Sequence, residues 1–495
     1  MTALTYLPWK RPAAYDNLPC VRDEQHELSY AEFAYRVVAA AEQFADHDVR
    51  PGSVVAVMLP NRVELLVALV AAWRLGATAS PVNPAFTATE ADYQINDAGA
   101  ALVVNSGDTA PDGGRPSIGV DELRRVPRGR MIPPARTAAD DIALLIYTSG
   151  STGHPKGVML SHGNIAAMAS MIVTGLGITQ QDHCLLILPL YHVNAICVSF
   201  LAPMLAGGRL SVLDRFRPRE FLTAIERLRP TYFSAVPTIY ALLVSQPAEA
   251  RADTSSLRFA VCGSAPTSPE LIAAVEERFG FALIEGYGLT EGTCGSTCSP
   301  LGGPRKPGTV GVPLPGQRLA IMSPGGELLP PGQRGEVVVQ GPNVMVGYLN
   351  RPEATAEVLG DGWLHTGDVG VLDEDGYLRL VDRIKDMIIC SGENLYPQEI
   401  ESVLQSHPAV VEAAVVGAPD ELYGEVPVAY VATWPGTKVD AADLLALCAT
   451  HLTKIKVPVA LHVADTLPKN PVGKIDKPRL RARQPRIQAT TRDGL

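Results

Sequence analysis

Between about residues 29 and 291, short apolar segments alternate with longer segments of apolar or amphipathic character. Val54–Leu59 precedes Glu64–Leu75, and Leu185–Pro189 precedes Ala195–Leu205. The short segments have the length of strands, and the longer ones have the length of helices. Because parallel strands need crossover connections of this kind, the alternation predicts parallel β-sheets covered by helices.

The same alternation continues toward residue 291. Thr231–Val236, Phe259–Cys262 and Ala282–Glu285 have the composition of buried strands, and Pro269–Phe279 lies between the last two as a predicted helix. A chain of 495 residues exceeds the size of one ordinary hydrophobic core. We therefore expect an α/β fold with more than one domain.

After about residue 305 the pattern changes to short β-rich segments separated by Pro/Gly turns. Arg318–Met322 and Gly335–Gln340 are two such segments, and Asp373–Gly376 has the composition of a hairpin turn. This part of the chain predicts a small β-barrel-like unit that closes a large N-terminal domain. A separate α+β segment begins at Asp382, and its predicted helix is Pro397–Gln405. We predict a large domain over residues 1–381 and a small mobile domain over residues 382–495.

Composition excludes several classes of protein. The formal net charge of −10 argues against nucleic acid as the main partner, because neutralising phosphates requires a basic face. The eight cysteines form no C-x-x-C pair, which argues against a zinc site or a disulfide framework and favours a reducing compartment. The longest apolar run, Leu65–Trp73, is shorter than the roughly 20 residues of a membrane span. We expect a cytoplasmic protein.

The segment Tyr147–Gly157, with sequence YTSGSTGHPKG, follows the predicted strand Ile142–Ile146. Gly, Ser and Thr at the end of a strand expose consecutive N–H groups and hydroxyls, which form a concave site for anions. Lys156 adds a positive charge suited to a phosphate. The G-x-x-x-x-G-K-[ST] spacing of a Walker A loop does not fit this segment.

This loop resembles the phosphate loop of the adenylate-forming superfamily, which includes acyl-CoA synthetases, adenylation domains of peptide synthetases and beetle luciferases. The resemblance extends in order from about residue 29 to about residue 480. Four further segments carry it: Gly286–Glu291 (adenine and magnesium motif), Trp363–Asp368 (ribose motif), Asp382–Ile388 with Gly392–Pro397 (hinge and following loop), and Pro468–Lys474 (catalytic lysine loop).

The resemblance implies a nucleotide site whose catalytic residues are Lys474, Glu291, Thr148 and Lys156. Lys474 would neutralise charge at the carboxylate and the α-phosphate, and Glu291 would bind Mg²⁺ through oxygen. Tyr287 would stack on adenine, and Asp368 would accept the ribose hydroxyl hydrogens. The full predicted nucleotide set is Thr148, Ser149, Gly150, Ser151, Thr152, Gly153, Lys156, Gly263, Ser264, Ala265, Gly286, Tyr287, Gly288, Thr290, Asp368 and Arg383.

The resemblance also implies a two-step reaction in one site. Members of the superfamily rotate the small domain about a residue that matches Asp382, which removes the lysine matching Lys474 before the thiol enters. Ser391, Gly392 and Glu393 would then line the coenzyme A tunnel. Many synthetases have Gly-Gly where this chain has Ser391-Gly392, so the departure bears on thiol transfer.

The predicted acid pocket combines His192, Val193, Gly263, Gly288, Gly292, Thr293 and Cys294. Small residues follow Glu291 and leave room for a bulky or extended acid. In relatives the acid pocket is formed partly by the segments that match Tyr191–Phe200, Val261–Pro266 and the residues after Glu291. Apart from Glu291, these segments contain no acidic residue, which argues against an amino acid as substrate. They contain no basic residue either, which argues against a dicarboxylic acid. Aromatic, fatty and polycyclic acids remain open.

We therefore expect an ATP-, Mg²⁺- and coenzyme A-dependent acid–thiol ligase that forms acyl-AMP and then acyl-CoA. The chain stops soon after Lys474 without a carrier domain, which favours free coenzyme A as the acceptor. Three alternatives stay open: a ligase that loads a separate carrier protein, an enzyme that retains only thioester formation, and a non-catalytic ATP-binding regulator. The sequence decides neither between monomer and homodimer nor the pathway.

Overall fold

The structure is a computed structural model that describes residues 4–130, 132–148, 155–265, 267–434, 436–437, 439–469 and 475–482. The chain forms two compact units, Met1–Leu319 with Val338–His365 and Ala320–Val337 with Thr366–Leu495. Helix-flanked sheets make up the first unit and an α+β arrangement makes up the second, so the predicted α/β class is confirmed. The predicted boundary at Asp382 and the mobility of the small domain stay predictions.

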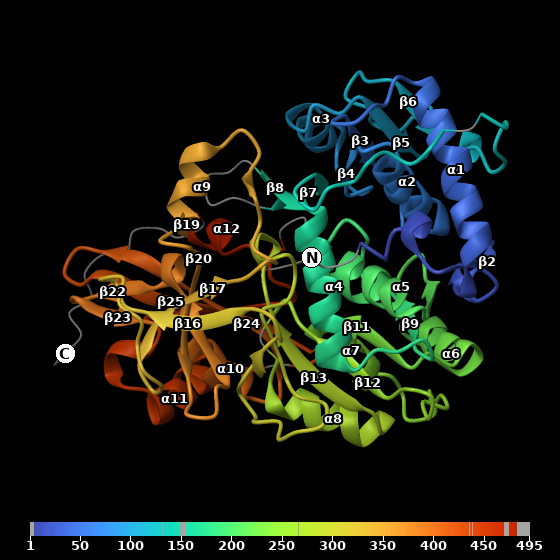
Figure 1. Ribbon diagram of the computed structural model, residues 1–495. Helices are drawn as coiled ribbons and strands as arrows, with labels where there is room; N and C mark the ends of the chain where they lie inside the picture. The colour runs from blue at the N-terminus through green and yellow to red at the C-terminus, as the bar shows by residue number, and fades with distance from the viewer. Residues whose placement is uncertain are drawn as a thin grey trace. The chain divides into compact units, whose positions relative to one another are not determined.

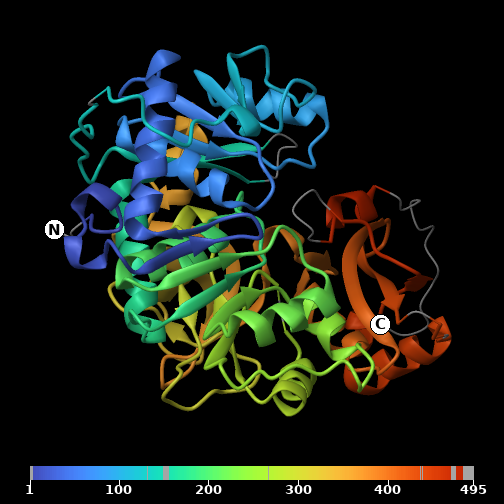
Figure 2. The ribbon, with the colours of Figure 1, turned by 90° about the vertical axis from the view of Figure 1, so that its right-hand side faces the viewer.

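One sheet of the first unit has the strand order β15-β14-β13-β12-β11-β9-β10-β1-β2. Its strands from β13 to β1 are parallel, as the alternating pattern predicted. Figure 2 shows the dark blue β1–β2 hairpin beside the green strands of this sheet. The bounds are β1 Pro19–Arg22, β2 Glu27–Ser29, β9 His183–Leu186, β10 Arg209–Val212, β11 Tyr232–Ala235, β12 Phe259–Cys262, β13 Ala282–Tyr287, β14 Thr297–Cys298 and β15 Val312–Pro313.

A second sheet of the same unit has the order β18-β8-β7-β4-β3-β5-β6. Strands β7, β4, β3, β5 and β6 are parallel, whereas β8 pairs antiparallel with both β7 and β18. The bounds are β3 Val54–Val57, β4 Thr78–Pro81, β5 Leu102–Asn105, β6 Ser117–Gly119, β7 Ile142–Thr148, β8 Lys156–Ser161 and β18 Gly347–Tyr348.

Helices of the first unit cover these sheets (Figure 1). Helix α4 packs against β7 and β8 and also against α5. It begins with a capping box between Ser161 and Asn164 and ends at Gly177 in the left-handed conformation. The bounds are α1 Tyr30–Asp46, α2 Val63–Arg74, α3 Ala88–Asp97, α4 His162–Leu176, α5 Ala202–Ala206, α6 Pro218–Leu228, α7 Pro237–Val244, α8 Pro269–Phe279 and α9 Pro352–Val358, with short 3₁₀ turns at Pro8–Lys10, Ala13–Tyr15, Val120–Glu122 and Thr290–Gly292 (η5).

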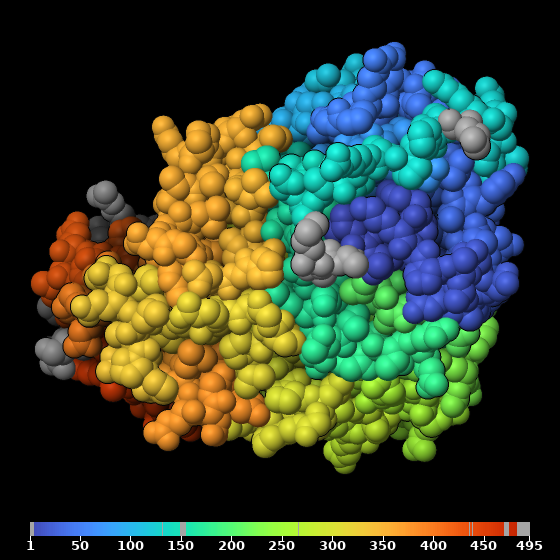
Figure 3. All heavy atoms as spheres, in the orientation of Figure 1, coloured from blue at the N-terminus to red at the C-terminus, as the bar shows by residue number. Residues whose placement is uncertain are grey.

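The first unit has more than one hydrophobic cluster, and the largest contains α2, whose residues Val63–Trp73 are all buried. The indole Nε1 of Trp73 donates to the carbonyl oxygen of Ala143 over 2.7 Å, which satisfies its polar atom inside the core. The N-terminal segment packs nearby, and the edge of one aromatic ring contacts the face of the other between Tyr6 and Trp73. Figure 3 shows this segment in dark blue between the teal and green parts of the unit.

The remaining strands form two further sheets. β20 pairs antiparallel with β19 and with β21 in a sheet that also contains β16 and β17, and the C-terminal sheet has the order β23-β22-β25-β24 with β26 on β25. The bounds are β16 Arg318–Met322, β17 Arg334–Gln340, β19 Leu359–Gly360, β20 Trp363–Leu372, β21 Leu378–Arg383, β22 Ile388–Cys390, β23 Glu393–Leu395, β24 Val410–Asp420, β25 Gly424–Thr433, β26 Ala460–Ala464, α10 Pro397–Gln405, α11 Ala441–His451 and α12 Lys477–Arg481, with 3₁₀ turns at Ile384–Asp386 and Lys454–Lys456.

Two predicted elements differ from the structure. The strand expected over Leu185–Pro189 ends at Leu186, because the Leu188 carbonyl accepts from the side chain of Asn61 instead of a neighbouring strand. The helix expected over Ala195–Leu205 forms, but its first part, Ala195–Leu201 (η4), is a π-helix. Within the described residues, no helix combines the length and the apolar composition needed to cross a bilayer.

Candidate active site

The predicted phosphate loop connects β7 to β8. Thr148 is the last residue of β7 and Lys156 is the first residue of β8. The two residues are paired directly in the antiparallel ladder. The next residue, Gly157, pairs with Tyr147, and a Cβ added to it would lie 2.9 Å from Leu145 Cδ1, so the Leu145 side chain would have to move. The hairpin therefore brings Thr148 and Lys156 together. Five predicted loop residues lie outside the described residues: Ser149, Gly150, Ser151, Thr152 and Gly153.

Glu291 lies in the 3₁₀ turn η5 that follows β13. Its Oε1 accepts a hydrogen bond from the Tyr348 hydroxyl over 2.7 Å, and its carbonyl oxygen accepts from the Met345 N–H over 2.8 Å. Burial, and next the negative charge of Glu291, raise the pKa of Tyr348, so the phenol stays protonated and donates. A carboxylate oxygen of Glu291 and the Thr148 hydroxyl are hard donors, which fit the oxygen preference of Mg²⁺.

Residues 345–351, here called the strap, run alongside β8. Within the strap, β18 pairs Gly347 with Met159 and Tyr348 with Val158, and the Leu349 N–H donates to the Gly157 carbonyl. The Lys156 Nζ lies 5.1 Å from the centroid of the Tyr348 ring. The strap thus joins the predicted magnesium ligand to the base of the predicted phosphate loop.

A second connection fixes the end of β7. The Tyr147 hydroxyl donates to Asp97 Oδ2 over 2.7 Å, and Arg351 of the strap contacts Asp97 Oδ1 over 3.3 Å. Burial, and next the hydrogen bond to Asp97, raise the pKa of Tyr147. Helix α3, strand β7 and the strap therefore meet at Asp97, beside Thr148.

The ends of β12 and β13 bring the glycines of the predicted adenine site together. A Cβ added to Gly263 would lie 3.1 Å from the Gly286 carbonyl oxygen, and one added to Gly288 would lie only 1.7 Å from the Cys294 carbonyl oxygen. Tyr287 pairs with Thr297 between these glycines. The other predicted residues in this region are Ser264, which is exposed with φ of 71°, Ala265, which is exposed, and Thr290, which begins η5.

The predicted acid-pocket residues come from the chain before η4 and from the turn after Glu291. The His192 ring lies 4.6 Å from the Tyr191 ring between centroids, and Val193 is buried. A hydrogen bond with Cys294, and next burial, raise the pKa of the Cys197 thiol. Gly292 and Thr293 are buried whereas Cys294 is partly exposed.

In the second unit, Asp368 and Arg383 are paired residues of the β20–β21 hairpin. The Arg383 Nε donates to Asp368 Oδ1 over 2.7 Å. The Asp368 side chain is 8% exposed and the Arg383 side chain is 45% exposed. The two predicted ribose-site residues are therefore adjacent, with a charged hydrogen bond that a ribose hydroxyl would share.

In the second unit, both carboxylate oxygens of Asp382, the predicted hinge residue, accept hydrogen bonds from backbone N–H groups. Its Oδ1 accepts from the Arg383 N–H over 2.7 Å and its Oδ2 accepts from the Gln398 N–H over 2.8 Å. Desolvation raises the pKa of Asp382 to about 6. The carboxylate therefore connects the end of β21 to the first turn of α10, where helix N–H groups favour an anion.

The predicted tunnel residues form the turn of the β22–β23 hairpin. Ser391 and Gly392 have φ of 52° and 79°, which is typical of a two-residue type I′ turn. A Cβ added to Gly392 would meet nothing within 4 Å, and Glu393 is exposed. Lys474 lies outside the described residues, so its place relative to the other predicted residues stays a prediction.

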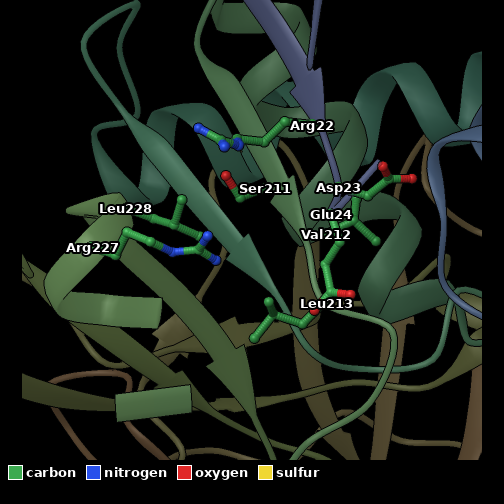
Figure 4. Close-up of a pocket in the computed structure, with 8 residues that line it drawn as sticks. All are labelled: Arg22, Asp23, Glu24, Ser211, Val212, Leu213, Arg227 and Leu228. Atoms are coloured by element: carbon green, nitrogen blue, oxygen red, sulfur yellow. The ribbon is translucent and has the colours of Figure 1, made fainter. Parts of the chain in front are cut away.

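A surface recess lies elsewhere on the first unit, at the ends of β1 and β10. Figure 4 shows the guanidinium groups of Arg22 and Arg227 on one side of it and the Asp23 carboxylate on the other. Strands β9, β11 and β12 separate β10 from β13, so the recess is distinct from the Glu291 region. Beside it, Asp23, His26 and Glu64 carry ligand-type atoms within 4.8 Å of one another.

In this second cluster the His26 ring lies between two carboxylates. The His26 Nδ1 lies 3.3 Å from Asp23 Oδ1, and its Nε2 lies 3.6 Å from Glu64 Oε1. Since the two ring nitrogens face different carboxylates, the imidazole bridges the acids. Arg62 and Arg125 lie 2.9 Å and 3.6 Å from the Glu64 carboxylate and offset its charge.

Sequence reasoning did not identify the residues that connect the candidate site, namely Tyr348, Asp97 and Arg351. Tyr348 lies in the short segment VMVGYL, which has the composition of an ordinary edge strand. Its partner Glu291 is 57 residues away along the chain. The Gly347-Tyr348 pair after a Pro/Gly turn does not indicate which distant residue Tyr348 contacts.

Comparison with known proteins identifies relatives over nearly the whole chain. A model of the AMP-binding enzyme family matches residues 8–349, and a model of the AMP-binding enzyme C-terminal domain matches residues 399–474. A feruloyl-CoA synthase from an Amycolatopsis species is 39% identical over 483 residues, covering 96% of this chain and 98% of the relative.

Solved structures agree with these matches. The crystal structure of ATP-bound MatB from Rhodopseudomonas palustris has a TM-score of 0.90 at 33% identity, covering 97% of this chain and 99% of that one. The o-succinylbenzoate coenzyme A synthetase MenE from Bacillus subtilis, in complex with ATP and a magnesium ion, has a TM-score of 0.86 at 34% identity, covering 94% of this chain and 96% of that one.

Proposed function

The chain belongs to the AMP-binding enzyme family as an AMP-forming acid–CoA ligase that uses ATP, Mg²⁺ and coenzyme A, and from this premise we propose that its acid is apolar and either bulky or extended. The observation that carries the proposal is η4, which borders the predicted acid pocket and is entirely buried and uncharged. The nucleotide chemistry is supported separately by Tyr348, whose side chain contacts both Glu291 and Lys156.

In the adenylation step, an oxygen of the substrate carboxylate attacks the α-phosphorus of ATP, and the bond to the β-phosphate breaks to release pyrophosphate. Thr148 and Lys156 would hold the β- and γ-phosphates at the β7–β8 hairpin. Glu291 would hold Mg²⁺, which neutralises phosphate charge when bound. Lys474 would stabilise the charge that develops at the α-phosphate.

The walls of the predicted acid pocket support an apolar substrate. η4 is entirely buried and contains no charged residue. A carboxylate or ammonium on the far end of a substrate would need a charged partner in such surroundings. The Amycolatopsis relative is named for ferulic acid, which is one of the aromatic acids that the sequence leaves open.

For the second step we propose free coenzyme A as the acceptor, in the cytoplasm. The thiol sulfur would attack the acyl carbonyl carbon and release its proton to solvent. A C–S bond would form, and the bond from that carbon to the phosphate oxygen would break, so that AMP leaves with the bonding electrons. Ser391 and Gly392 would line the pantetheine path, because Gly392 has open space where a side chain would otherwise stand. Rotation about Asp382 would exchange Lys474 for this turn between the two steps.

The test is a pyrophosphate-release screen with ATP, Mg²⁺ and a panel of carboxylic acids, with and without coenzyme A. The panel contains ferulic and benzoic acids, fatty acids of several lengths, a polycyclic acid, malonic acid and an amino acid. We expect acid-dependent release and acyl-CoA formation with an apolar acid. Turnover of malonic acid or the amino acid alone would contradict the proposed substrate class. Acyl-CoA formation only from supplied acyl-AMP would indicate that thioester formation alone survives.

A further inference from the structure

The Tyr348 side chain contacts both the Glu291 carboxylate and the Lys156 ammonium of the candidate site. Its hydroxyl donates to Glu291 Oε1 over 2.7 Å, and its ring centroid lies 5.1 Å from the Lys156 Nζ. In the part of the chain that the structure describes, Tyr348 is the hydrogen-bond donor to the Glu291 side chain, and Lys156 contacts the Tyr348 ring without forming an ion pair with Glu291. One carboxylate oxygen is thus occupied by the phenol.

The strap holds the phenol in this place. Tyr348 is 7% exposed and is paired with Val158 in β8, two residues from Lys156. Met345, three residues earlier in the strap, donates its N–H to the Glu291 carbonyl. Because backbone and side chain of Glu291 are both bound by the strap, the Glu291 carboxylate has little freedom to turn toward Lys156.

We propose that Tyr348 is a positioning residue that orients the Glu291 carboxylate for Mg²⁺ and keeps the Lys156 ammonium free for the phosphates of ATP. The inference rests on the proposed function. A direct Lys156–Glu291 ion pair would have to break when ATP and Mg²⁺ bind. The phenol prevents that pair by giving the carboxylate a neutral donor and the ammonium an aromatic face.

Two substitutions separate the two contacts. Tyr348→Phe removes the hydroxyl but keeps the ring, so it leaves the core packing and the Lys156 contact in place. Tyr348→Leu removes both contacts. Tyr30→Phe is the matched control, because Tyr30 is a buried tyrosine that donates to the Gly208 carbonyl over 2.6 Å, away from these residues.

Calorimetry of ATP binding, with and without Mg²⁺, gives a readout that does not depend on turnover. We expect Tyr348→Phe to raise the Mg²⁺ concentration at half-saturation about 10-fold, as expected for the loss of a hydrogen bond to a charged group, while ATP binding without Mg²⁺ changes less than about 2-fold. Tyr348→Leu should in addition weaken ATP binding without Mg²⁺ about 5-fold, because Lys156 loses its aromatic contact. Tyr30→Phe should leave both constants unchanged.

A double-mutant cycle distinguishes positioning from general packing. If the phenol acts through the carboxylate, Tyr348→Phe should have no further effect on Mg²⁺ half-saturation in a Glu291→Gln background. Likewise, Lys156→Ala should remove the difference between the Phe and Leu variants in ATP binding without Mg²⁺. Additive effects in both cycles, or a Tyr348→Phe protein that matches Tyr30→Phe, would overturn the inference. Absence of pyrophosphate release with every acid would instead refute the proposed function, and the calorimetry would still decide the role of Tyr348.

Discussion

The Tyr147 hydroxyl and Asp97 Oδ2 are joined by a 2.7 Å hydrogen bond that connects the last turn of α3 to the end of β7. Asp97 is also within 3.3 Å of Arg351, and its side chain is 14% exposed. Replacing Asp97 by Ala should leave a half-buried phenol without an acceptor and Arg351 without its counter-ion. We expect a loss of about 1–3 kcal/mol in unfolding free energy, measured by urea titration, together with weaker ATP binding.

The control for this substitution is Asp46→Ala, which removes the exposed pairs with Arg124 and Arg130. Exposed ion pairs contribute about 0–1 kcal/mol, so the control should lose less than Asp97→Ala. Tyr147→Phe removes the donor hydroxyl but leaves Asp97 its contact with Arg351, so it should also cost less. Equal losses in Asp97→Ala and Asp46→Ala would mean that the Asp97 junction does not support the loop.

Gly288 lies where no side chain fits. A Cβ at this position would be 1.7 Å from the Cys294 carbonyl oxygen, so Gly288→Ala must displace the turn that carries Cys294 and adjoins Glu291. We expect loss of acid-dependent pyrophosphate release by at least about 100-fold, since small displacements of reacting groups cost that much. Thermal unfolding and the release assay measure the two consequences.

Gly302 provides the matched control for this substitution. It lies in a loop and a Cβ there would meet nothing within 4 Å. Gly302→Ala should therefore keep wild-type activity and unfolding temperature. An active Gly288→Ala protein would show that the adenine-side turn tolerates displacement, contrary to the role proposed for it.

The secondary structure was predictable wherever local chemistry and tertiary packing agreed. The helix Pro269–Phe279 has the predicted bounds because Pro269 occupies its first turn, Ser268 caps it, and Gly280 ends it with φ of 74°. The strand Phe259–Cys262 also has the predicted bounds, since its four buried apolar residues lie between Arg258 and Gly263.

The long-range contacts of the site were not predictable from one sequence. The resemblance to the adenylate-forming superfamily predicted roles for Thr148, Lys156 and Glu291, and these roles stay predictions. Nothing local in the two-residue strand β18 indicates that Tyr348 reaches Glu291. The π-helical geometry of Ala195–Leu201 was also hidden, because its apolar composition suits any buried helix.

The partly buried carboxyl of Glu285, next to Gly286 in β13, should make the stability of the fold depend on pH. Desolvation raises the pKa of this carboxyl to about 7. Between the ordinary carboxyl pKa near 4.5 and pH 7, the unfolded chain has lost this proton while the folded chain keeps it. The folded state therefore binds more protons, and its stability falls as pH rises through this window. Glu285→Gln should remove the penalty and raise stability by about 1–3 kcal/mol at pH 8, with little change near pH 4.5.

Thermal unfolding at a series of pH values measures this effect. The matched control is Glu277→Gln, which removes an exposed carboxylate from the neighbouring helix α8. The difference in stability between Glu277→Gln and the wild type should stay nearly constant with pH, in contrast to the difference expected for Glu285→Gln. If Glu285→Gln gave the same increment at pH 5 and pH 8, then burial of an ionised Glu285 would not limit stability.

Lys474→Ala tests whether adenylation and thioester formation use different residues. The lysine would stabilise charge only while the carboxylate attacks ATP, so its loss should abolish acid-dependent pyrophosphate release. Thioester formation from supplied acyl-AMP and coenzyme A should stay within about 3-fold of the wild type, since that step needs no group at this position. Equal loss of both steps would contradict the proposed alternation about Asp382.

Gly392→Leu tests the other half of that alternation. The substitution adds bulk at the Ser391-Gly392 turn, so pyrophosphate release should continue while acyl-CoA production stops. Backbone strain is a competing cause of failure, because Gly392 has φ of 79° and left-handed backbone costs other residues about 1–2 kcal/mol. Gly392→Asn separates the two causes, since Asn tolerates that conformation and is smaller than Leu. We expect the Asn variant to keep most thioester formation, whereas loss of pyrophosphate release in the Leu variant would mean that the turn serves adenylation instead.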